Sequence, residues 1–264
     1  RDGAARSGGG SGRGPGPGAG YRARSGGTAV SGENACIVLF VRFPEKGAVK
    51  TRLAPLLDGE DLVALYHAFV ADLLATLEKC GYPFRIAFTP AEREADMVRL
   101  FGRYELFPQA GPDLGVRMGN AFRRCFSAGF DRVVLIGSDI PDLPPEILTE
   151  SLAALDGHDA VIGPALDGGY YLIGFRRETF RPEAFAEIVW GTGEVCIRTR
   201  ERLSRMGSRV RLLAPWRDVD TPEDLRDLVR RSRGSPFARS QTMAWLAVRC
   251  APDAWGTPPR DLQP

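Results

Sequence analysis

The stretch Ala35-Cys-Ile-Val-Leu-Phe-Val41 holds seven apolar residues in a row, and Glu60 to Lys79 then carries apolar residues at helical spacing. A short continuous apolar run is typical of a strand that is buried on both faces. Apolar residues three and four positions apart are typical of a helix with one buried face. The same alternation continues to about Arg233 and predicts strands at 84–88, 132–137, 159–165, 170–175 and 209–214, and helices at 92–101, 114–128, 145–155, 193–206 and 222–231.

This alternation of strands and helices predicts an α/β fold with three layers, in which helices cover both faces of a mostly parallel sheet. The neighbouring strands 159–165 and 170–175 flank an Asp167-Gly168 pair, which is typical of a two-residue hairpin turn, so we expect an antiparallel insertion there. In open sheets of this class, ligands bind beyond the carboxyl ends of the strands, where the strand order reverses. The residues that follow each strand are therefore the candidates for function.

The two ends of the chain differ in composition from the region between them. Residues 1–33 hold 12 of the 31 glycines and five arginines, without apolar periodicity, which predicts a disordered Gly/Arg-rich tail. Residues 234–264 are Pro-rich and form a C-terminal extension, in which only Met243 to Val248 indicates a short helix. We therefore expect the folded domain to span residues 34–233.

Composition and charge exclude several classes of protein. The longest apolar run has seven residues, whereas a membrane-spanning helix needs about 20. The net charge of +2 provides no field to recruit nucleic acid, although the Arg/Gly tail leaves RNA binding as an alternative. The five cysteines lie at least 44 residues apart, which predicts reduced thiols and a cytoplasmic location, and we expect no secretory signal. Neither of the two histidines, His67 and His158, lies in a motif.

A basic loop follows the first strand, with the sequence Arg42-Phe-Pro-Glu-Lys46-Gly-Ala-Val-Lys50-Thr-Arg52. Its four cationic side chains include two of the three lysines in the chain, and a compact ammonium is a common phosphate ligand. The single glycine, Gly47, lets the backbone approach an anion, and successive amides there can form an anion-binding nest. The loop therefore indicates a phosphate site. A solvated basic loop with turns at Pro44 and Gly47 explains the pattern equally well.

Carboxylates follow the strand at 132–137 and precede the last predicted helix. Asp139 lies just beyond the strand, where a Mg²⁺ ion bound by one or two carboxylates and by phosphate oxygens would be placed. Capping of the helix that starts near Pro144 does not explain Asp139, because Asp142 is closer to that helix.

Farther along the chain, Thr221-Pro-Glu-Asp224 has the pattern of a helix start, with Thr221 as the N-cap. Capping does not explain Asp218 and Asp220, which point to the same side of an extended segment. One of these two carboxylates is therefore a candidate for a second metal ligand.

Two further segments allow both a structural and a functional interpretation. Asp113 is placed to cap the helix at 114–128, and Gly115 and Gly119 permit close packing of that helix. Alternatively, Gly115 and Arg117 line a nucleotide pocket. In the second segment the Asp-Gly pair favours a turn. Two glycines followed by two tyrosines also leave room for a sugar or base to stack, at Asp167, Gly168, Gly169 and Tyr170.

Five motifs in this order resemble the DUF2064 family, which is described as a glycosyltransferase family of the nucleotide-diphospho-sugar transferase superfamily and includes members associated with arsenosugar biosynthesis. The motifs span roughly residues 34–232 and lie at 40–53, 113–118, 137–143, 163–174 and 218–225. The segment from Lys50 to Leu53 is also similar to that of 2-phospholactate guanylyltransferases, which are nucleotidyltransferases on the same fold. The sequence departs from the family pattern at Pro112 and Val116, where a glycine and a glutamate are more common.

The resemblance implies a glycosyltransferase A-type fold and a Mg²⁺- or Mn²⁺-dependent transfer from a nucleotide-diphospho-sugar to a small-molecule acceptor. It implies metal ligation by Asp139 and Asp220, with Asp167 as the alternative second ligand, and catalytic roles for Lys50, Arg52 and Asp139. The implied nucleotide-binding residues are Arg42, Pro44, Gly47, Lys50, Arg52, Gly115, Arg117 and Ser138. The implied sugar or acceptor pocket is Asp167, Gly168, Gly169 and Tyr170.

Two alternatives to glycosyl transfer stay open. One is nucleotidyl transfer that releases pyrophosphate from a nucleoside triphosphate, which the clustered cations favour on physical grounds. The other is a nucleotide- or RNA-binding protein without catalytic activity. The sequence does not specify the base, the sugar, the acceptor or the oligomeric state.

Overall fold

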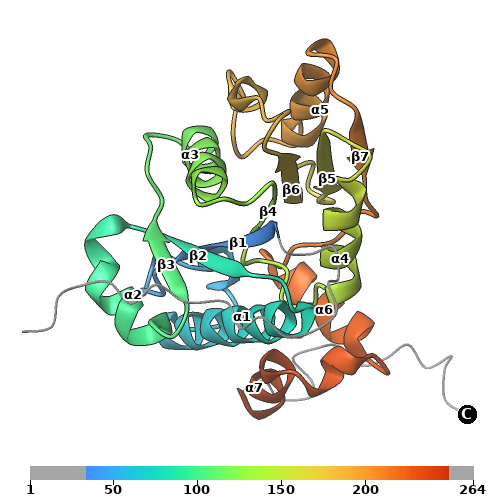
Figure 1. The fold of residues 1–264 in the computed structure, drawn as a ribbon. Coiled ribbons are helices and arrows are strands. Elements are labelled where there is room, and N and C mark those ends of the chain that lie inside the picture. The colour runs from blue at the N-terminus through green and yellow to red at the C-terminus, as the bar shows by residue number, and fades with distance from the viewer. Residues whose placement is uncertain (1–33, 250–264) are drawn as a thin grey trace, which may run out of the picture. The chain divides into compact units, whose positions relative to one another are not determined.

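The computed structural model describes residues 34–249, which form a seven-stranded sheet with helices on both faces (Figure 1). The strand order is β3-β2-β1-β4-β6-β5-β7, and β6 runs antiparallel to both of its neighbours. The strands are β1 (Ala35–Arg42), β2 (Phe84–Thr89), β3 (Glu105–Pro108), β4 (Arg132–Ile136), β5 (Ala160–Pro164), β6 (Tyr170–Arg176) and β7 (Val210–Leu212). The predicted α/β class, with a mostly parallel sheet and an antiparallel insertion, is confirmed.

The helices lie close to their predicted positions. They are α1 (Gly59–Cys80), α2 (Glu94–Phe101), α3 (Leu114–Ser127), α4 (Pro145–Ala154), α5 (Val195–Arg205), α6 (Pro222–Ser232) and α7 (Gln241–Arg249). Short 3₁₀ helices occur at η1 (Thr51–Leu53), η2 (Ala91–Arg93), η3 (Pro182–Phe185) and η4 (Pro236–Arg239). The residues between 34 and 249 include no helix that is both long enough and apolar enough to cross a membrane.

Strand β1 is buried on both faces, as its continuous apolar run predicts. Alternate residues of β1 belong to two separate hydrophobic clusters, one on each face of the sheet. Ile37 and Leu39 contribute to the cluster under α1 and α4, whereas Val38 and Phe40 contribute to the cluster under α3 (Figure 1). Because β1 pairs with β2 on one side and with β4 on the other, the strand order reverses at this point of the sheet. The carboxyl ends of β1 and β4 are therefore the expected ligand side.

A third hydrophobic cluster connects the loop after β1 to the segment before α6. Leu53 of η1 and Val219 are both fully buried in it, together with residues of α1, α6 and α7. Burial of one such side chain stabilises the fold by about 1.5–3 kcal/mol. The apolar packing therefore holds two segments together that are far apart in the sequence.

Part of the predicted C-terminal extension packs on the domain. Helix α7 lies along α1, its Leu246 is buried in the third cluster, and the carboxylate of Asp72 accepts the backbone N–H groups of Gln241 and Thr242 at its start. The predicted tail, 1–33, and residues 250–264 lie outside the described residues.

Two local predictions are wrong. The connection between β5 and β6 is a five-residue loop, 165–169, and not a two-residue turn at Asp167-Gly168. Its conformation is held by bonds within the loop, where the backbone N–H of Gly169 donates to the Asp167 carboxylate. The short edge strand β3 was not predicted, because only Phe107 of its four residues is buried and its apolar run is correspondingly brief.

The predicted close packing is confirmed at Gly115, whereas Gly119 leaves room for a Cβ atom, and this difference provides a test of the α3 packing. A Cβ atom at Gly115 would lie 2.8 Å from the Trp190 ring and 3.0 Å from the Phe185 carbonyl oxygen, whereas one at Gly119 would have no neighbour nearer than 3.7 Å. We expect Gly115→Ala to lower the free energy of unfolding by about 1–3 kcal/mol through overpacking. Gly119→Ala, in the same helix, should be neutral or stabilising by up to about 1 kcal/mol. Urea unfolding of the two variants measures the difference, and equal values would contradict the packing argument.

Candidate functional site

The side chain of Lys50 joins the loop after β1 to the segments after β4 and before α6. Its ammonium donates to the carboxylate of Asp139, to the backbone oxygen of Val219 at 2.7 Å, and to Oδ1 of Asp220 at 3.1 Å. Asp139 and Asp220 are 89 and 170 residues away from Lys50 in the sequence. The basic loop and the acidic strand end, which the sequence analysis considered separately, therefore meet at one point.

The backbone of Lys50 has a conformation that is rare for a residue with a side chain. Its φ of 51° and ψ of 32° lie in the left-handed region, directly before η1. Such a conformation costs a non-glycine residue about 1–2 kcal/mol. The side chain is 2% exposed, and its Nζ lies 5.3 Å from the centre of the Phe69 ring, within cation–π distance. The three hydrogen bonds and this burial hold the strained turn in place.

The surroundings of Lys50 keep its side chain charged. Burial on its own lowers the pKa of the ammonium, but Asp139 and Asp220 outweigh burial and raise that pKa above its ordinary value. Arg52 lies at the edge of the same group, with Nη1 4.0 Å from Oδ2 of Asp220 and its side chain 74% exposed. Two of the four cationic residues of the loop thus face the carboxylates.

The other two cationic residues of the loop have different partners. Lys46 forms an exposed ion pair with Glu60 on α1, at 2.7 Å, and the guanidinium of Arg42 donates to the backbone oxygen of Ala48. Gly47 is exposed with a φ of 75° and lies in the turn closed by the hydrogen bond from Ala48 N–H to the Glu45 carbonyl oxygen, as the turn interpretation expects. Pro44 differs from that interpretation, because it is buried and precedes the turn. Contact of Arg42, Pro44 and Gly47 with a nucleotide stays a prediction.

Negative charge exceeds positive charge around Lys50. The pKa of Asp218 is raised to about 6 by burial and, in decreasing order, by the charges of Asp167 and Asp220. The negative charges of Asp167 and Asp220 thus both disfavour ionisation of Asp218. A cation bound among them would relieve that repulsion.

The donor set fits a divalent cation that the protein shares with a phosphate-bearing ligand. The side chains of Asp139 and Asp220 are 46% and 35% exposed, so both carboxylates can be reached from solvent. Within residues 34–249, no three side chains of His, Cys, Asp or Glu are grouped to hold an ion by themselves. Mg²⁺ typically takes one or two carboxylates and keeps water and substrate phosphates as its other ligands. Metal binding by this pair stays a prediction.

Tyr66 of α1 connects two strands beneath the site, and it was not among the residues that the sequence analysis named as candidates. Its hydroxyl accepts the backbone N–H of Arg42 at 3.0 Å and is bonded to the Ser138 hydroxyl at 2.8 Å. Burial, followed by the charge of Asp139, raises the pKa of Tyr66 to about 12, so the phenol stays neutral. Tyr66 therefore connects the ends of β1 and β4. Contact of Ser138 with a nucleotide stays a prediction.

Two of the remaining predicted residues, Tyr170 and Gly115, lie next to Trp190, which the sequence analysis missed because the residue lies in a loop without a motif. The ring of Tyr170 packs edge-on against Trp190, and its hydroxyl contacts Sδ of Met118. Gly115 lies so close to the Trp190 ring that a Cβ atom on it would be 2.8 Å from the ring. Their roles toward a ligand stay predictions, as do those of Arg117, whose Nε donates to the Gly111 carbonyl, and of Gly168, which packs on Gly193.

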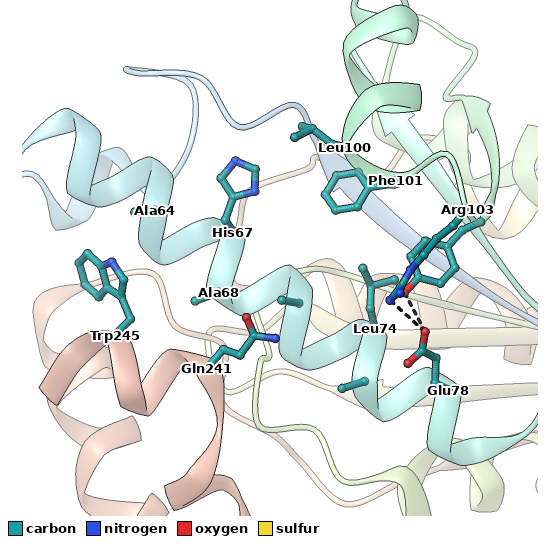
Figure 2. A pocket seen from close by; sticks show the side chains of 13 residues that line it. Ala64, His67, Ala68, Leu74, Glu78, Leu100, Phe101, Arg103, Gln241 and Trp245 are labelled. Carbon is teal, nitrogen blue, oxygen red and sulfur yellow. Dashed lines mark hydrogen bonds and ion pairs between the residues drawn. The ribbon is translucent and has the colours of Figure 1, made fainter. Parts of the chain in front are cut away.

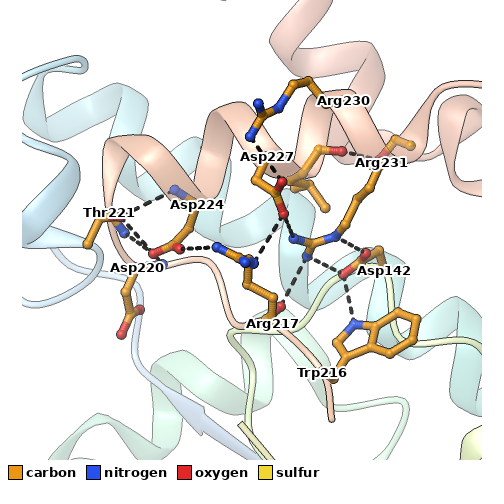
Figure 3. A network of polar contacts seen from close by, with 11 residues as sticks. Asp142, Trp216, Arg217, Asp220, Thr221, Asp224, Asp227, Arg230 and Arg231 are labelled. Carbon is orange, nitrogen blue, oxygen red and sulfur yellow. Dashed lines mark hydrogen bonds and ion pairs between the residues drawn. The ribbon is translucent and has the colours of Figure 1, made fainter. Parts of the chain in front are cut away.

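Helix capping follows the prediction at two of three starts. Asp113 caps α3, and Thr221 and Asp224 form a capping box at the start of α6. The prediction that Asp142 caps α4 is wrong, because Pro144 holds the cap position and makes no side-chain cap bond. The carboxylate of Asp142 instead accepts hydrogen bonds from Arg231 and Trp216 (Figure 3).

Two cavities lie outside this group of charged residues. One, of about 530 Å³, lies between α1, α2 and α7 and contains none of the predicted site residues (Figure 2). The other, of about 560 Å³, lies between α3 and the loop that follows β6, and it is lined in part by Asp113, Gly115 and Trp190.

Comparison with known proteins identifies the family. The model of DUF2064, described as "Uncharacterized protein conserved in bacteria", matches residues 72–192. A crystal structure described as a "putative nucleotide-diphospho-sugar transferase" from Desulfovibrio desulfuricans G20 is 42% identical, covers 81% of this chain and 94% of its own, and superposes with a TM-score of 0.78. The chain belongs to the DUF2064 family.

More distant structures resemble this DUF2064 protein at lower scores. CMP:2-keto-3-deoxy-manno-octonic acid synthetase complexed with CTP is 15% identical, covers 76% of this chain and 99% of its own, and has a TM-score of 0.47. Rv0371c from Mycobacterium tuberculosis H37Rv, complexed with manganese, is 17% identical, covers 75% and 98%, and has a TM-score of 0.45. No curated protein sequence matches the chain.

The raised pKa of Asp218 predicts a pH-dependent stability of this DUF2064 protein. Because the folded pKa of about 6 exceeds the ordinary 3.8, the folded state loses stability as the pH rises through this interval. The full shift corresponds to ~3 kcal/mol, which partial exposure reduces to about 1 kcal/mol. Asp218→Asn should therefore raise Tm by about 2–4 °C at pH 8 and much less at pH 4. Differential scanning calorimetry with EDTA measures this, with Asp156→Asn as the control, and an equal gain at both pH values would contradict the prediction.

Proposed function

We propose that this protein is a transferase that acts on a nucleotide-diphospho-sugar. In this proposal the diphosphate binds, together with a divalent cation, where the Lys50 turn meets Asp139 and Asp220. The observation that carries it is the contact of one buried ammonium with both carboxylates beyond the carboxyl ends of β1 and β4. The 42% identical relative, described as a nucleotide-diphospho-sugar transferase, supports the same substrate class.

The charged groups of the site have different roles toward the diphosphate of such a substrate. The ammonium of Lys50 is fixed by three hydrogen bonds and holds the two carboxylates at a defined separation. The guanidinium of Arg52 is mostly exposed and can turn toward a phosphate oxygen. A divalent cation bound by Asp139 and Asp220 would neutralise the negative charge that develops on a departing phosphate group. Catalysis here would rest on positioned charge and not on a covalent nucleophile.

Nucleotidyl transfer is the second candidate, and a specific observation favours it. The Arg52 side chain is 74% exposed beside the carboxylate pair, and an exposed guanidinium next to a bound cation suits the larger charge of a triphosphate. The two reactions release different products: a nucleoside diphosphate in glycosyl transfer, and pyrophosphate in nucleotidyl transfer. Incubation with nucleoside triphosphates and nucleotide sugars, followed by assays for both products, distinguishes them.

Nucleotide binding should depend on the residues of this site and not on the charge of the loop as a whole. We expect Lys50→Met and Asp139→Asn to lower turnover about a hundredfold, since removing one positioned charge costs ~3 kcal/mol of barrier stabilisation. Asp139→Asn should also remove the Mg²⁺-dependent part of nucleotide affinity. Thermal-shift and calorimetric titrations with nucleotides and nucleotide sugars, with and without Mg²⁺, measure the binding.

The loop and the sheet offer matched controls. Lys46→Met removes one cation from the same loop but breaks only the exposed pair with Glu60. Asp156→Asn removes a carboxylate that pairs with Arg132 at the start of β4, whereas Asp139 lies beyond its end. Both controls should keep affinity and turnover. Nucleotide affinity that is insensitive to Asp139→Asn would instead support a binding protein without this metal site.

A further inference from the structure

Asp142 and Arg231 form a half-buried ion pair that is separate from Lys50 and its carboxylates. Nε and Nη2 of Arg231 donate to the two oxygens of Asp142 at 2.7 and 3.0 Å, which is a bidentate pair. Nε1 of Trp216 donates to Oδ1 of the same carboxylate at 3.2 Å (Figure 3). The Asp142 side chain is only 7% exposed. Asp142 therefore accepts three hydrogen bonds in a place where an unpaired charge would be costly.

This pair connects the two loops that carry the candidate metal ligands. Asp142 follows Asp139 by three residues, in a loop that Ile140 and Leu143 anchor by full burial. Arg231 lies on α6, and its Nη2 also donates to the backbone oxygen of Arg217, at the start of the segment that leads to Asp220.

The contacts continue without a gap from Arg231 to Asp220 (Figure 3). Arg231 pairs with Asp227, and Asp227 pairs with the Arg217 side chain. Arg217 in turn faces Asp224, which accepts the backbone N–H of Asp220 at 3.3 Å. In addition, the backbone N–H of Val219 donates to the carbonyl oxygen of Asp139 at 2.8 Å, which links the segment before α6 directly to the loop after β4.

The network is balanced in charge, so it adds little field of its own to the site. It contains three carboxylates and three guanidinium groups, of Asp142, Asp224, Asp227, Arg217, Arg230 and Arg231. What it provides is geometry, because it fixes the β4–α4 loop against the segment before α6. In metal sites, residues that orient the ligands in this way commonly change metal affinity or activity 10- to 100-fold when they are replaced.

We propose that Asp142 and Arg231 are positioning residues that set the separation of Asp139 and Asp220, and thereby hold the Lys50 ammonium between them. The consequence for metal and nucleotide rests on the proposed function, whereas the consequence for Lys50 does not. When the pair is broken, the two loops separate and the Lys50 amine becomes accessible to solvent. The affinity of the carboxylate pair for a divalent cation with a nucleoside diphosphate falls as well.

The test measures the accessibility of Lys50 directly in the full chain. The chain has three lysines, so acylation by an amine-selective reagent, followed by peptide mass spectrometry, compares Lys50 with Lys46 and Lys79 as internal references. We expect Asp142→Asn to raise the ratio of Lys50 to Lys46 labelling several-fold above its value in the unmodified chain, because the buried amine becomes accessible to the reagent. Arg231→Lys, which keeps the charge but cannot form the bidentate pair, should raise it less. Circular dichroism checks that each variant is folded, and the labelling is done well below the Tm of each variant, so that only folded states are compared.

The control is Asp156→Asn, which breaks the Asp156–Arg132 ion pair near the opposite end of β4. A role in stability alone would lower Tm in both Asp→Asn variants and leave Lys50 protected in both. Protection of Lys50 in folded Asp142→Asn and Arg231→Lys would therefore overturn the proposal. Increased labelling in these two variants and not in Asp156→Asn would support it.

A second measurement separates this inference from the proposed function. Calorimetric titration with Mn²⁺ and each of ADP, CDP, GDP, UDP and dTDP identifies a nucleotide that the unmodified chain binds, and binding of that nucleotide should be roughly 10- to 100-fold weaker in Asp142→Asn. Unchanged binding in a variant with exposed Lys50 would overturn the role toward the ligand. If the unmodified chain binds none of these complexes, the proposed function fails, and the labelling ratio still decides whether Asp142 and Arg231 position the site.

Discussion

The ammonium of Lys50 has three hydrogen-bond partners in two distant segments, and the geometry of the candidate site depends on this contact. Without the ammonium, the carboxylates of Asp139 and Asp220 would lie close together with no positive charge between them. Because the Lys50 side chain is almost fully buried, solvent screens the attraction only weakly. The strained backbone of Lys50 is the local cost of placing the ammonium there.

Several layers of structure support that one contact. Apolar packing of Leu53 and Val219 brings the two segments together, and the Tyr66 hydroxyl connects the ends of β1 and β4. The charge of Asp218 is unfavourable in the folded state above a pH of about 6, because burial and the charges of Asp167 and Asp220 disfavour it. Unfavourable charges of this kind gather at sites that await a counter-charge. The family membership and the position of the carboxylates therefore both support a ligand-binding site in this region.

Much of the fold could be predicted from the sequence because its signals are local. The continuous apolar run of β1 indicated burial on both faces, and the Thr221-to-Asp224 capping box located the start of α6 to the residue. Local signals failed where the decisive contact is distant. Asp142 has the spacing of a helix cap, but Arg231, 89 residues away, provides a stronger partner for its charge. Strand β3 is held by its pairing with β2 and not by its own short apolar run.

The sequence by itself determined the helices, six of the seven strands in residues 34–249 and the chemical character of each loop, since these follow from spacing, capping and charge along a few residues. It also identified Lys50, Asp139 and Asp220 as separate candidates. Only the tertiary structure decided that these three side chains meet, that Lys46 turns away to Glu60, and that Tyr66 and Trp190 belong to the surroundings of the site. The reason is physical: each of these contacts joins separate elements of the chain, and folding of the whole sheet sets their distance.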